Sequence, residues 1–333
     1  MAVKLAENIY RIDVDMPKSP LKNLNVYVVK GEDRNLLIDT GERKDAARSA
    51  LFRGLEELEV DLDKTDIFLT HFHPDHLGLV PELYREGMKV YMGRSDVKMK
   101  LLTVGEQDPK AWIDNRRRLG FPETEAAESA KADMKTYPPE TFDKYTPIDD
   151  GEVLEYGGYR FVTIHTPGHT PGHMCLYEPD RKYMFTGDHV LFSITPNIAH
   201  WSSRIDSLGD YVHSLMKIRD LDVKLLMPAH RQVTGSLAER VDEIIEHHGK
   251  RVKETEDLLN EHPGSSAYEL AAFMQWNLRY EGGWENFPKG QKMFAASEVR
   301  AHLEYLACRG RVRKEYVDDM AKFYPLNKTG DAT

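Results

Sequence analysis

The sequence predicts a layered α/β protein that carries a smaller α+β module at its C-terminal end. Two groups of short apolar or alternating stretches, one before residue 93 and one after residue 150, have the period and length of β-strands and lead into helical stretches. Pro263 and Gly264 end the last long helical stretch, and the pattern changes behind them. With 333 residues, the chain is long enough for more than one domain.

The individual elements follow from period and from turn residues. Turns that contain glycine, proline or asparagine separate the strands, and charged helices fill the region 95–145. We expect strands at 7–14, 24–31, 35–39, 66–70, 88–92, 152–158, 159–165, 174–178, 182–188 and 224–228. We expect helices at 43–58, 108–119, 124–137, 206–220 and 236–262.

The C-terminal module has its own order of elements. Two helices, expected at 266–276 and 295–310, precede two short strands and a charged turn within 311–326. The order of helix, helix and β-wing is typical of a winged helix. We therefore place a domain boundary after His262 and expect a winged-helix-like domain at 263–333.

The composition favours a cytoplasmic protein that binds neither membranes nor nucleic acids. No apolar run reaches the length that a membrane span needs, and the N-terminal stretch is charged where a signal peptide would be apolar. With 45 basic against 55 acidic residues, the net charge of -10 opposes binding to phosphate backbones. Cys175 and Cys308 are too few for a disulfide framework, and we expect both to be buried thiols.

The strongest candidate site is the segment THFHPDH at the end of an expected strand. Because side chains alternate along an extended chain, His71 and His73 point to one side. Pro74 ends the strand and a helix can start there, which turns Asp75 and His76 back toward the same place. Taken alone, the pattern also fits surface histidines beside a helix-capping aspartate.

Three later segments end in further candidate ligands. His169 lies in the rigid turn TPGHTPGH, Asp188 ends the segment FTGD, and His230 ends the segment PAH. A carboxylate at the end of an apolar strand is costly unless it meets a cation or hydrogen-bond donors. Five histidines and two aspartates form a ligand set without thiolate, which suits Zn²⁺, Fe or Mn. Because seven ligands exceed the needs of one tetrahedral ion, we predict two divalent ions, with Zn²⁺ favoured.

These motifs, preceded by LLIDTG, resemble in order the motifs of the metallo-β-lactamase superfamily of αββα metallohydrolases, over roughly residues 8–250. The resemblance implies an αββα sandwich as the catalytic domain at 1–262. Asp188 would bridge the two metal ions, and Asp39 would orient the histidine loop without binding metal. The ligands implied for the first ion are His71, His73 and His169. The ligands implied for the second ion are Asp75, His76 and His230.

Two details place the sequence within that superfamily. Histidine at position 169, where other members carry Cys or Asp, places it nearer the glyoxalase II, lactonase and RNase Z-like branches than the true β-lactamases. The C-terminal module resembles the winged-helix module of β-lactamase-like 2 proteins, some of which are endoribonucleases.

The resemblance and the ligand set imply a binuclear hydrolase in which a metal-bridging hydroxide cleaves an ester, thioester or lactone bond of a small molecule. Asp75 is expected to orient the hydroxide or to pass its proton to the leaving group. No G-x-S-x-G elbow or cysteine motif offers another nucleophile. The alternatives are a nuclease that uses the same metals, a di-iron redox enzyme, for which a flavin domain is lacking, and an inactive scaffold.

The remaining expectations concern substrate access and assembly. The segment 95–145 is expected to form a lid over the metal cleft, and His200 is expected to contact the substrate. The tail is nearly balanced in charge and rich in aromatic residues, which favours a homodimer over nucleic-acid binding. The histidines expected to be hydrogen-bonded supports are His165, His173 and His189. The histidines expected to have no role, on helices with solvent-facing neighbours, are His213, His247 and His248.

Overall fold

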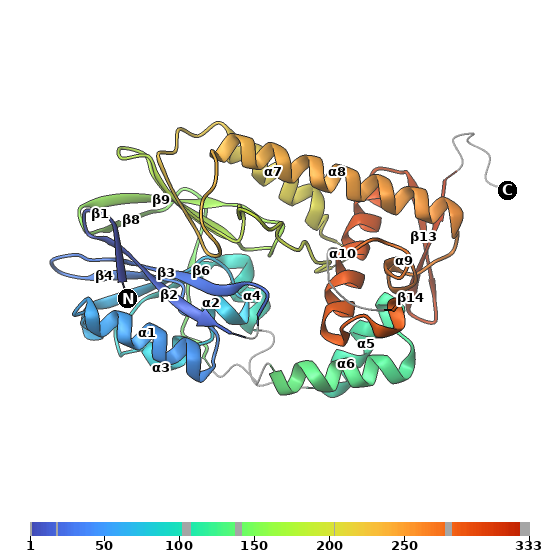
Figure 1. Ribbon diagram of the computed structural model, residues 1–333, viewed down its shortest axis with the longest axis horizontal. Helices are drawn as coiled ribbons and strands as arrows, with labels where there is room; N and C mark the ends of the chain where they lie inside the picture. Colours follow the sequence, from blue (N-terminus) through green and yellow to red (C-terminus); the bar gives the residue numbers. More distant parts are fainter. Residues whose placement is uncertain are drawn as a thin grey trace. The chain divides into compact units, whose positions relative to one another are not determined.

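The structure is a computed structural model that describes residues 2–17, 19–101, 108–136, 142–202, 204–276 and 282–326 (Figure 1). The chain divides into two compact units, each assembled from three segments. Unit 1 comprises Met1–Gly105, Glu140–Pro196 and His213–Asp242. Unit 2 comprises Glu106–Pro139, Asn197–Val212 and Glu243–Thr333.

Unit 1 contains a seven-stranded sheet whose strands follow one another in chain order. The first four strands form an antiparallel meander, and the fourth to the seventh are parallel. The central strands β4 and β5 are buried along their whole length, including the polar residues Asn35, Thr65 and Asp66 at their beginnings. The strands are β1 (Ala2–Ala6), β2 (Ile9–Met16), β3 (Lys22–Val29), β4 (Asn35–Ile38), β5 (Thr65–Leu69), β6 (Val90–Gly93) and β7 (Thr146–Ile148).

A second, five-stranded sheet in unit 1 has the order β12-β11-β10-β9-β8. Its strands are antiparallel except for β11 and β12, which run parallel. The strands are β8 (Val153–Tyr156), β9 (Tyr159–His165), β10 (Met174–Glu178), β11 (Tyr183–Gly187) and β12 (Leu225–Pro228).

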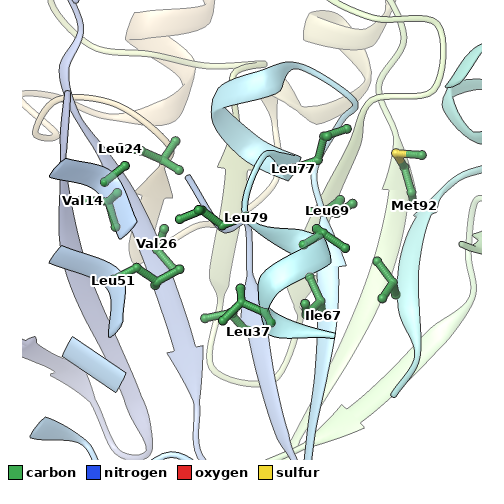
Figure 2. Close-up of a cluster of buried hydrophobic side chains, with 14 of the residues drawn as sticks. Val14, Leu24, Val26, Leu37, Leu51, Ile67, Leu69, Leu77, Leu79 and Met92 are labelled. Carbon is green, nitrogen blue, oxygen red and sulfur yellow. The ribbon is translucent and has the colours of Figure 1, made fainter. Parts of the chain in front are cut away.

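Two apolar clusters hold the layers of unit 1 together. One cluster joins the two sheets and includes Phe68, Phe161 and Phe185. The other packs helices against the outer face of the seven-stranded sheet, where Figure 2 shows Leu51 and Leu77 meeting side chains from the strands. The helices on this side are α1 (Asp45–Glu57), α2 (Pro74–Leu77) and α3 (Val80–Leu83), and a 3-10 turn follows α1 at Leu62–Lys64. This layering fixes the strand ends that carry the candidate ligands.

Unit 2 is built from helices and one hairpin. An apolar cluster that includes Leu119, Phe121 and Tyr268 joins the helices of the 108–136 segment to the C-terminal helices. The hairpin turns at Asp318 and Asp319, both with positive φ, which is typical of a two-residue turn. Its elements are α5 (Pro109–Leu119), α6 (Glu123–Thr136), α9 (Ala267–Ala271), a 3-10 turn (Trp284–Asn286), α10 (Lys289–Cys308), β13 (Val312–Val317) and β14 (Met320–Pro325).

The units are assembled differently from the ranges 1–262 and 263–333 that the sequence suggested. Helices α5 and α6 belong to unit 2, and two helices pass from one unit to the other: α7 (Ser207–Arg219) and α8 (Leu237–Glu261). The physical reason is that the apolar faces of α5 and α6 pack against α10, a pairing of distant segments that local patterns do not reveal.

Several local expectations also differ from the structure. The strands β1 and β7 and the helix α4 (Arg94–Leu101) were not expected, whereas α9 is shorter than expected. Cys175 is buried as expected, but Cys308 is exposed because it lies at the end of α10. In the ranges that the structure describes, no helix has the length and apolar character needed to cross a membrane.

Candidate metal centre

The loop that follows β5 brings four of the predicted residues to one place. The extended chain after Leu69 carries His71 and His73, and α2 begins at Pro74 with His73 as its N-terminal flanking residue. Proline suits the first helical position because its missing N–H would have no partner there. Asp75 and His76 therefore lie in the first turn of α2, as the sequence predicted.

The other three predicted residues also follow strand ends of unit 1. His169 lies in the turn between β9 and β10, Asp188 follows β11, and His230 follows the parallel neighbour β12. Positive φ at Gly168 and Gly187 shapes two of these turns. A Cβ on Gly187 would lie 2.6 Å from Nε2 of His173, so only glycine fits there.

Seven residues converge as three overlapping groups whose ligand atoms lie within 4.8 Å of one another in each group. The first group is His71, His73 and His169. The second group is Asp75, His76 and His230. A third, formed by His71, His76 and Asp188, lies between them. The structure thus brings together all seven candidate ligands, in the division that the resemblance implied.

The spacing within the first group suits one ion. Nδ1 of His73 lies 2.9 Å from Nε2 of His71 and 2.9 Å from Nε2 of His169. Nitrogens at tetrahedral positions with zinc bonds of about 2.0 Å would be separated by about 3.3 Å. The three rings thus need little movement to share one ion.

The second group is completed by Asp188. Nε2 of His230 lies 3.3 Å from Oδ2 of Asp75 and 3.5 Å from Oδ1 of Asp188. The other oxygen of Asp188 lies 3.6 Å from Nε2 of His169, in the first group. One carboxylate therefore faces both groups, as expected of a bridging ligand.

Hydrogen bonds on the far side of the rings fix which nitrogen faces the centre. Nδ1 of His76 donates to Oδ2 of Asp39 at 2.8 Å, and Nδ1 of His230 donates to the carbonyl oxygen of Asn23 at 2.8 Å. The hydroxyl of Thr70 donates to Asp39 and accepts from Nδ1 of His71 at 3.1 Å. In each ring the proton therefore lies on Nδ1, and the lone pair of Nε2 faces the centre.

Buried atoms without hydrogen-bond partners test whether these residues fit a cation. Nε2 of His76, Nε2 of His230 and Oδ1 of Asp188 are buried, and none of them has a hydrogen-bond partner within the part of the chain that the structure describes. Unsatisfied buried acceptors are costly in a folded protein. All three face the same small space, and a cation there would satisfy them together.

The pKa shifts of the histidines separate the two groups. Burial works against the charged form of His76 and His230, but the neighbouring carboxylates outweigh it and raise the pKa of both rings. Burial, together with neighbouring histidines, holds the pKa of His71 well below its ordinary value and lowers the pKa of His73 to about 3. Both rings therefore offer neutral nitrogens at neutral pH. Burial opposes ionisation of Asp75 and Asp188, but the adjacent histidines lower the pKa of each carboxyl group below its usual range.

Sequence reasoning missed two buried side chains that hold these loops. Asn25 in β3 donates through Nδ2 to the carbonyl oxygens of Pro228 and Arg231, on either side of the His230 loop. Asp96 in α4 accepts hydrogen bonds from two other loops of the centre, and burial raises its pKa to about 7. A polar residue amid the apolar positions of β3 was a usable signal for Asn25, whereas no pattern marks Asp96.

The supporting histidines lie close to the candidate ligands. His173 is fully buried; its Nδ1 donates to the hydroxyl of Thr166 at 2.9 Å, and its Nε2 accepts from the backbone N–H of Asp188 at 3.2 Å. Nε2 of His165 donates to the carbonyl oxygen of Pro171. Hydrogen bonding was the role predicted for both.

Two further histidines belong to unit 2. The backbone N–H of His200 donates to the hydroxyl of Ser297, and its expected contact with substrate stays a prediction. His248 was expected on a helix with solvent-facing neighbours and without a role. It is itself buried, and its Nδ1 lies 3.4 Å from Nε2 of His302. Packing of α8 against α10 buries it.

Comparisons with known proteins agree with this geometry. The family described as the metallo-beta-lactamase superfamily matches residues 21–230, more than half of the chain. A solved metallo-beta-lactamase family protein from Thermus thermophilus superposes with a TM-score of 0.79 at 27% identity, over 97% of this chain and 100% of that one. A beta-lactamase domain protein from Burkholderia ambifaria shares the fold, with a TM-score of 0.76 at 20% identity, over 98% and 95% of the two chains.

The curated relatives match this chain over only part of their own length. The lactamase-like protein aptB of Emericella nidulans is 27% identical over 72% of this chain and 62% of its own length. A beta-lactamase-like protein 2 homolog of Caenorhabditis elegans is 26% identical over 78% and 73%. An atrochrysone carboxyl ACP thioesterase of Emericella nidulans is 27% identical over 66% of this chain, which spans 55% of that relative. The motifs, the fold and the family match together show that the chain belongs to the metallo-β-lactamase superfamily.

Proposed function

We propose that the chain is a binuclear metallohydrolase that cleaves an ester, thioester or lactone bond of a small molecule. The observation that carries the proposal is the set of unsatisfied buried acceptors at His76, His230 and Asp188, beside a second group of three histidines. Relatives named as thioesterases favour a thioester among the three bonds.

The residues proposed to hold the ions are the seven of the three groups, with Asp188 facing both positions. Divalent ions bound there, with Zn²⁺ favoured, would polarise the scissile carbonyl group and lower the pKa of an attacking water molecule. Asp39, Thr70 and the carbonyl group of Asn23 keep the histidine lone pairs directed at the centre. His173 holds the backbone of Asp188 in place.

Asp75 is proposed to move the proton. Its side chain keeps 18% of its surface exposed, whereas the side chains of His76 and His230 are fully buried. Its pKa lies below the usual range, so the carboxylate is ionised at neutral pH and can accept a proton. Oδ2 lies beside His230 in the second group, which leaves Oδ1 to accept the proton, and the exposed part of the side chain gives a route for the proton toward a leaving group.

A panel of thioester, lactone, aryl ester and RNA substrates tests the proposal, with the zinc-reconstituted chain and its Asp188→Asn variant as the control. We expect turnover of an ester-type substrate that is lost in Asp188→Asn, while far-UV circular dichroism shows the variant folded. Cleavage of RNA alone would contradict the proposal and favour the nuclease.

The C-terminal region is proposed to serve assembly as a homodimer and not to bind nucleic acid. In α10, which would be the recognition helix of a winged helix, Arg300 and Glu304 are buried and paired with each other at 2.7 Å. Charges that are paired inside the protein do not neutralise phosphates. Phe294 and Tyr316, by contrast, are about half exposed and offer apolar surface to a partner.

A further inference from the structure

We propose that Asp96 is a positioning residue that holds together the two loops of the first group, an inference that rests on the metal role proposed above for those histidines. Asp96 lies in the first turn of α4 and is fully buried. It belongs to none of the three candidate ligand groups. Its role is therefore to act through the histidines and not to bind the ion.

The carboxylate of Asp96 reaches both loops at once. Oδ2 accepts hydrogen bonds from the backbone N–H of Phe72 at 3.2 Å and from the hydroxyl of Thr170 at 2.7 Å. Oδ1 accepts from the backbone N–H of Gly172 at 2.5 Å. Phe72 separates the two histidines of one loop, and Thr170 directly follows the histidine of the other. One side chain thus fixes the spacing between the two loops.

The turn from β6 into α4 reaches these loops because glycine stands on both sides of the contact. A Cβ on Gly93 would lie 1.9 Å from the carbonyl oxygen of Gly172. A Cβ on Gly172 would lie 2.4 Å from the backbone nitrogen of Asp96. Both clashes would be with backbone atoms, so no change of rotamer could relieve them. Both glycines therefore allow the two backbones to approach closely, which places Asp96 beside the loops of the first group.

A second buried carboxylate in unit 1 shows what a purely structural arrangement looks like. Asp66 accepts from the guanidinium group of Arg34 at 2.7 Å, from the backbone N–H of Lys89 and from the hydroxyl of Tyr156. A cation compensates its charge. Among the residues that the structure describes, the donors to Asp96 are all uncharged, and they come from the two loops. Burying a carboxylate without a cation is costly, so its position is best explained by the loops that it joins.

This inference changes the role expected for the segment 95–145. The segment was expected to form a lid over the metal cleft. Because α4 begins it and carries Asp96, the start of the segment supports the first group directly. Variants at Asp96 should therefore change metal affinity, whereas variants farther along the segment should not.

The test compares Asp96→Asn with Asp66→Asn, a matched control because both variants replace a buried carboxyl group of unit 1 that accepts at least three hydrogen bonds. Stepwise titration with Zn²⁺ against a chromophoric chelator gives the dissociation constants of both variants and the wild type. We expect Asp96→Asn to weaken one constant by about 10- to 100-fold, as is typical for a residue that orients metal ligands, and Asp66→Asn to weaken neither.

Hydrogen exchange of the metal-free proteins adds a readout that does not depend on metal. Asp96→Asn should speed exchange in peptides covering both 70–74 and 166–173, and Asp66→Asn should not. Thr170→Val removes one donor and keeps the side-chain shape, so it should give a smaller change in the same direction. Exchange in these peptides also separates the failure of this inference from the failure of the proposed function. If the wild type does not bind two ions, the binuclear function is refuted, and the exchange rates of the metal-free variants then decide the role of Asp96.

Two results would overturn the inference. One is that Asp96→Asn binds both ions as tightly as the wild type. The other is that exchange in the two loops stays at the wild-type rate, or that Asp66→Asn speeds it equally.

Discussion

Replacing Asp39 by Asn should weaken metal binding without abolishing it, because the change acts on the tautomer of His76. Asp39 lies at the end of β4 with a positive φ of 61°, and its two oxygens accept from the backbone N–H and hydroxyl of Thr70 and from Nδ1 of His76. The carboxylate accepts only, so it holds the proton of His76 on Nδ1. Asparagine keeps the shape but replaces one acceptor by a donor.

Either orientation of the asparagine is unfavourable. If its NH₂ group faces His76, the ring must move its proton to Nε2 and loses the lone pair that faces the centre. If its NH₂ group faces Thr70, the backbone N–H there loses its acceptor. An unsatisfied buried donor costs about 1–3 kcal/mol, which corresponds to about 5- to 150-fold in affinity.

The assay is a competition titration of Zn²⁺ against a chromophoric chelator, for the wild type, Asp39→Asn and Asp188→Asn. We expect Asp39→Asn to bind more weakly by about 10- to 100-fold, within the range worked out above. Asp188→Asn, which removes the carboxylate that faces both groups, should lose at least one ion entirely. The reasoning about the tautomer is refuted if Asp39→Asn binds like the wild type or loses metal as fully as Asp188→Asn.

Three further predictions concern unit 2, which contains all four tryptophans of the chain, so that its unfolding can be followed by tryptophan fluorescence. Burial lowers the pKa of His302 to about 4 from 6.5, so stability that is present above pH 6.5 is lost as the pH falls toward 4. Between neutral pH and pH 5, the free energy of unfolding should fall by about 2 kcal/mol less in His302→Asn than in the wild type. Equal decreases in the two proteins would contradict this. Leu119→Ala should destabilise unit 2 by about 2–5 kcal/mol in urea denaturation, because Leu119 lies in its core, whereas a change confined to the Michaelis constant would show a role in the lid. Light scattering should show a dimer that Tyr316→Ser shifts toward the monomer, and a monomeric wild type would rule out the assembly proposed here.

The sequence predicted most of the centre because its residues form short local motifs at strand ends. His71, His73, Asp75 and His76 lie within six residues, and a buried strand followed by proline determines their directions. His169 was predicted in the same way, because the prolines and glycines around it define a short local turn. Convergence of these segments then follows from strands that end at one edge of each sheet.

Features that depend on the pairing of distant segments could not be predicted in this way. Asp96 acts on loops that are far from it in sequence, so neither period nor spacing marks it. Asn25 stands out as a polar residue in an apolar strand, but the pattern does not reveal the loop that it binds. His248 looks exposed beside its polar neighbours, yet it faces His302 across two helices. The association of α5 and α6 with α10 depends on which apolar faces meet, which a single sequence does not encode locally.

The number of metal ions bound per chain tests the central claim most directly. Elemental analysis of the protein, reconstituted with excess Zn²⁺ and freed of loosely bound metal, should give about two ions per chain, because the two groups and the shared Asp188 provide separate places for two. A value near two that falls in Asp188→Asn is the result we predict. Fewer than about one ion per chain in the folded, fully reconstituted wild type would contradict the binuclear account.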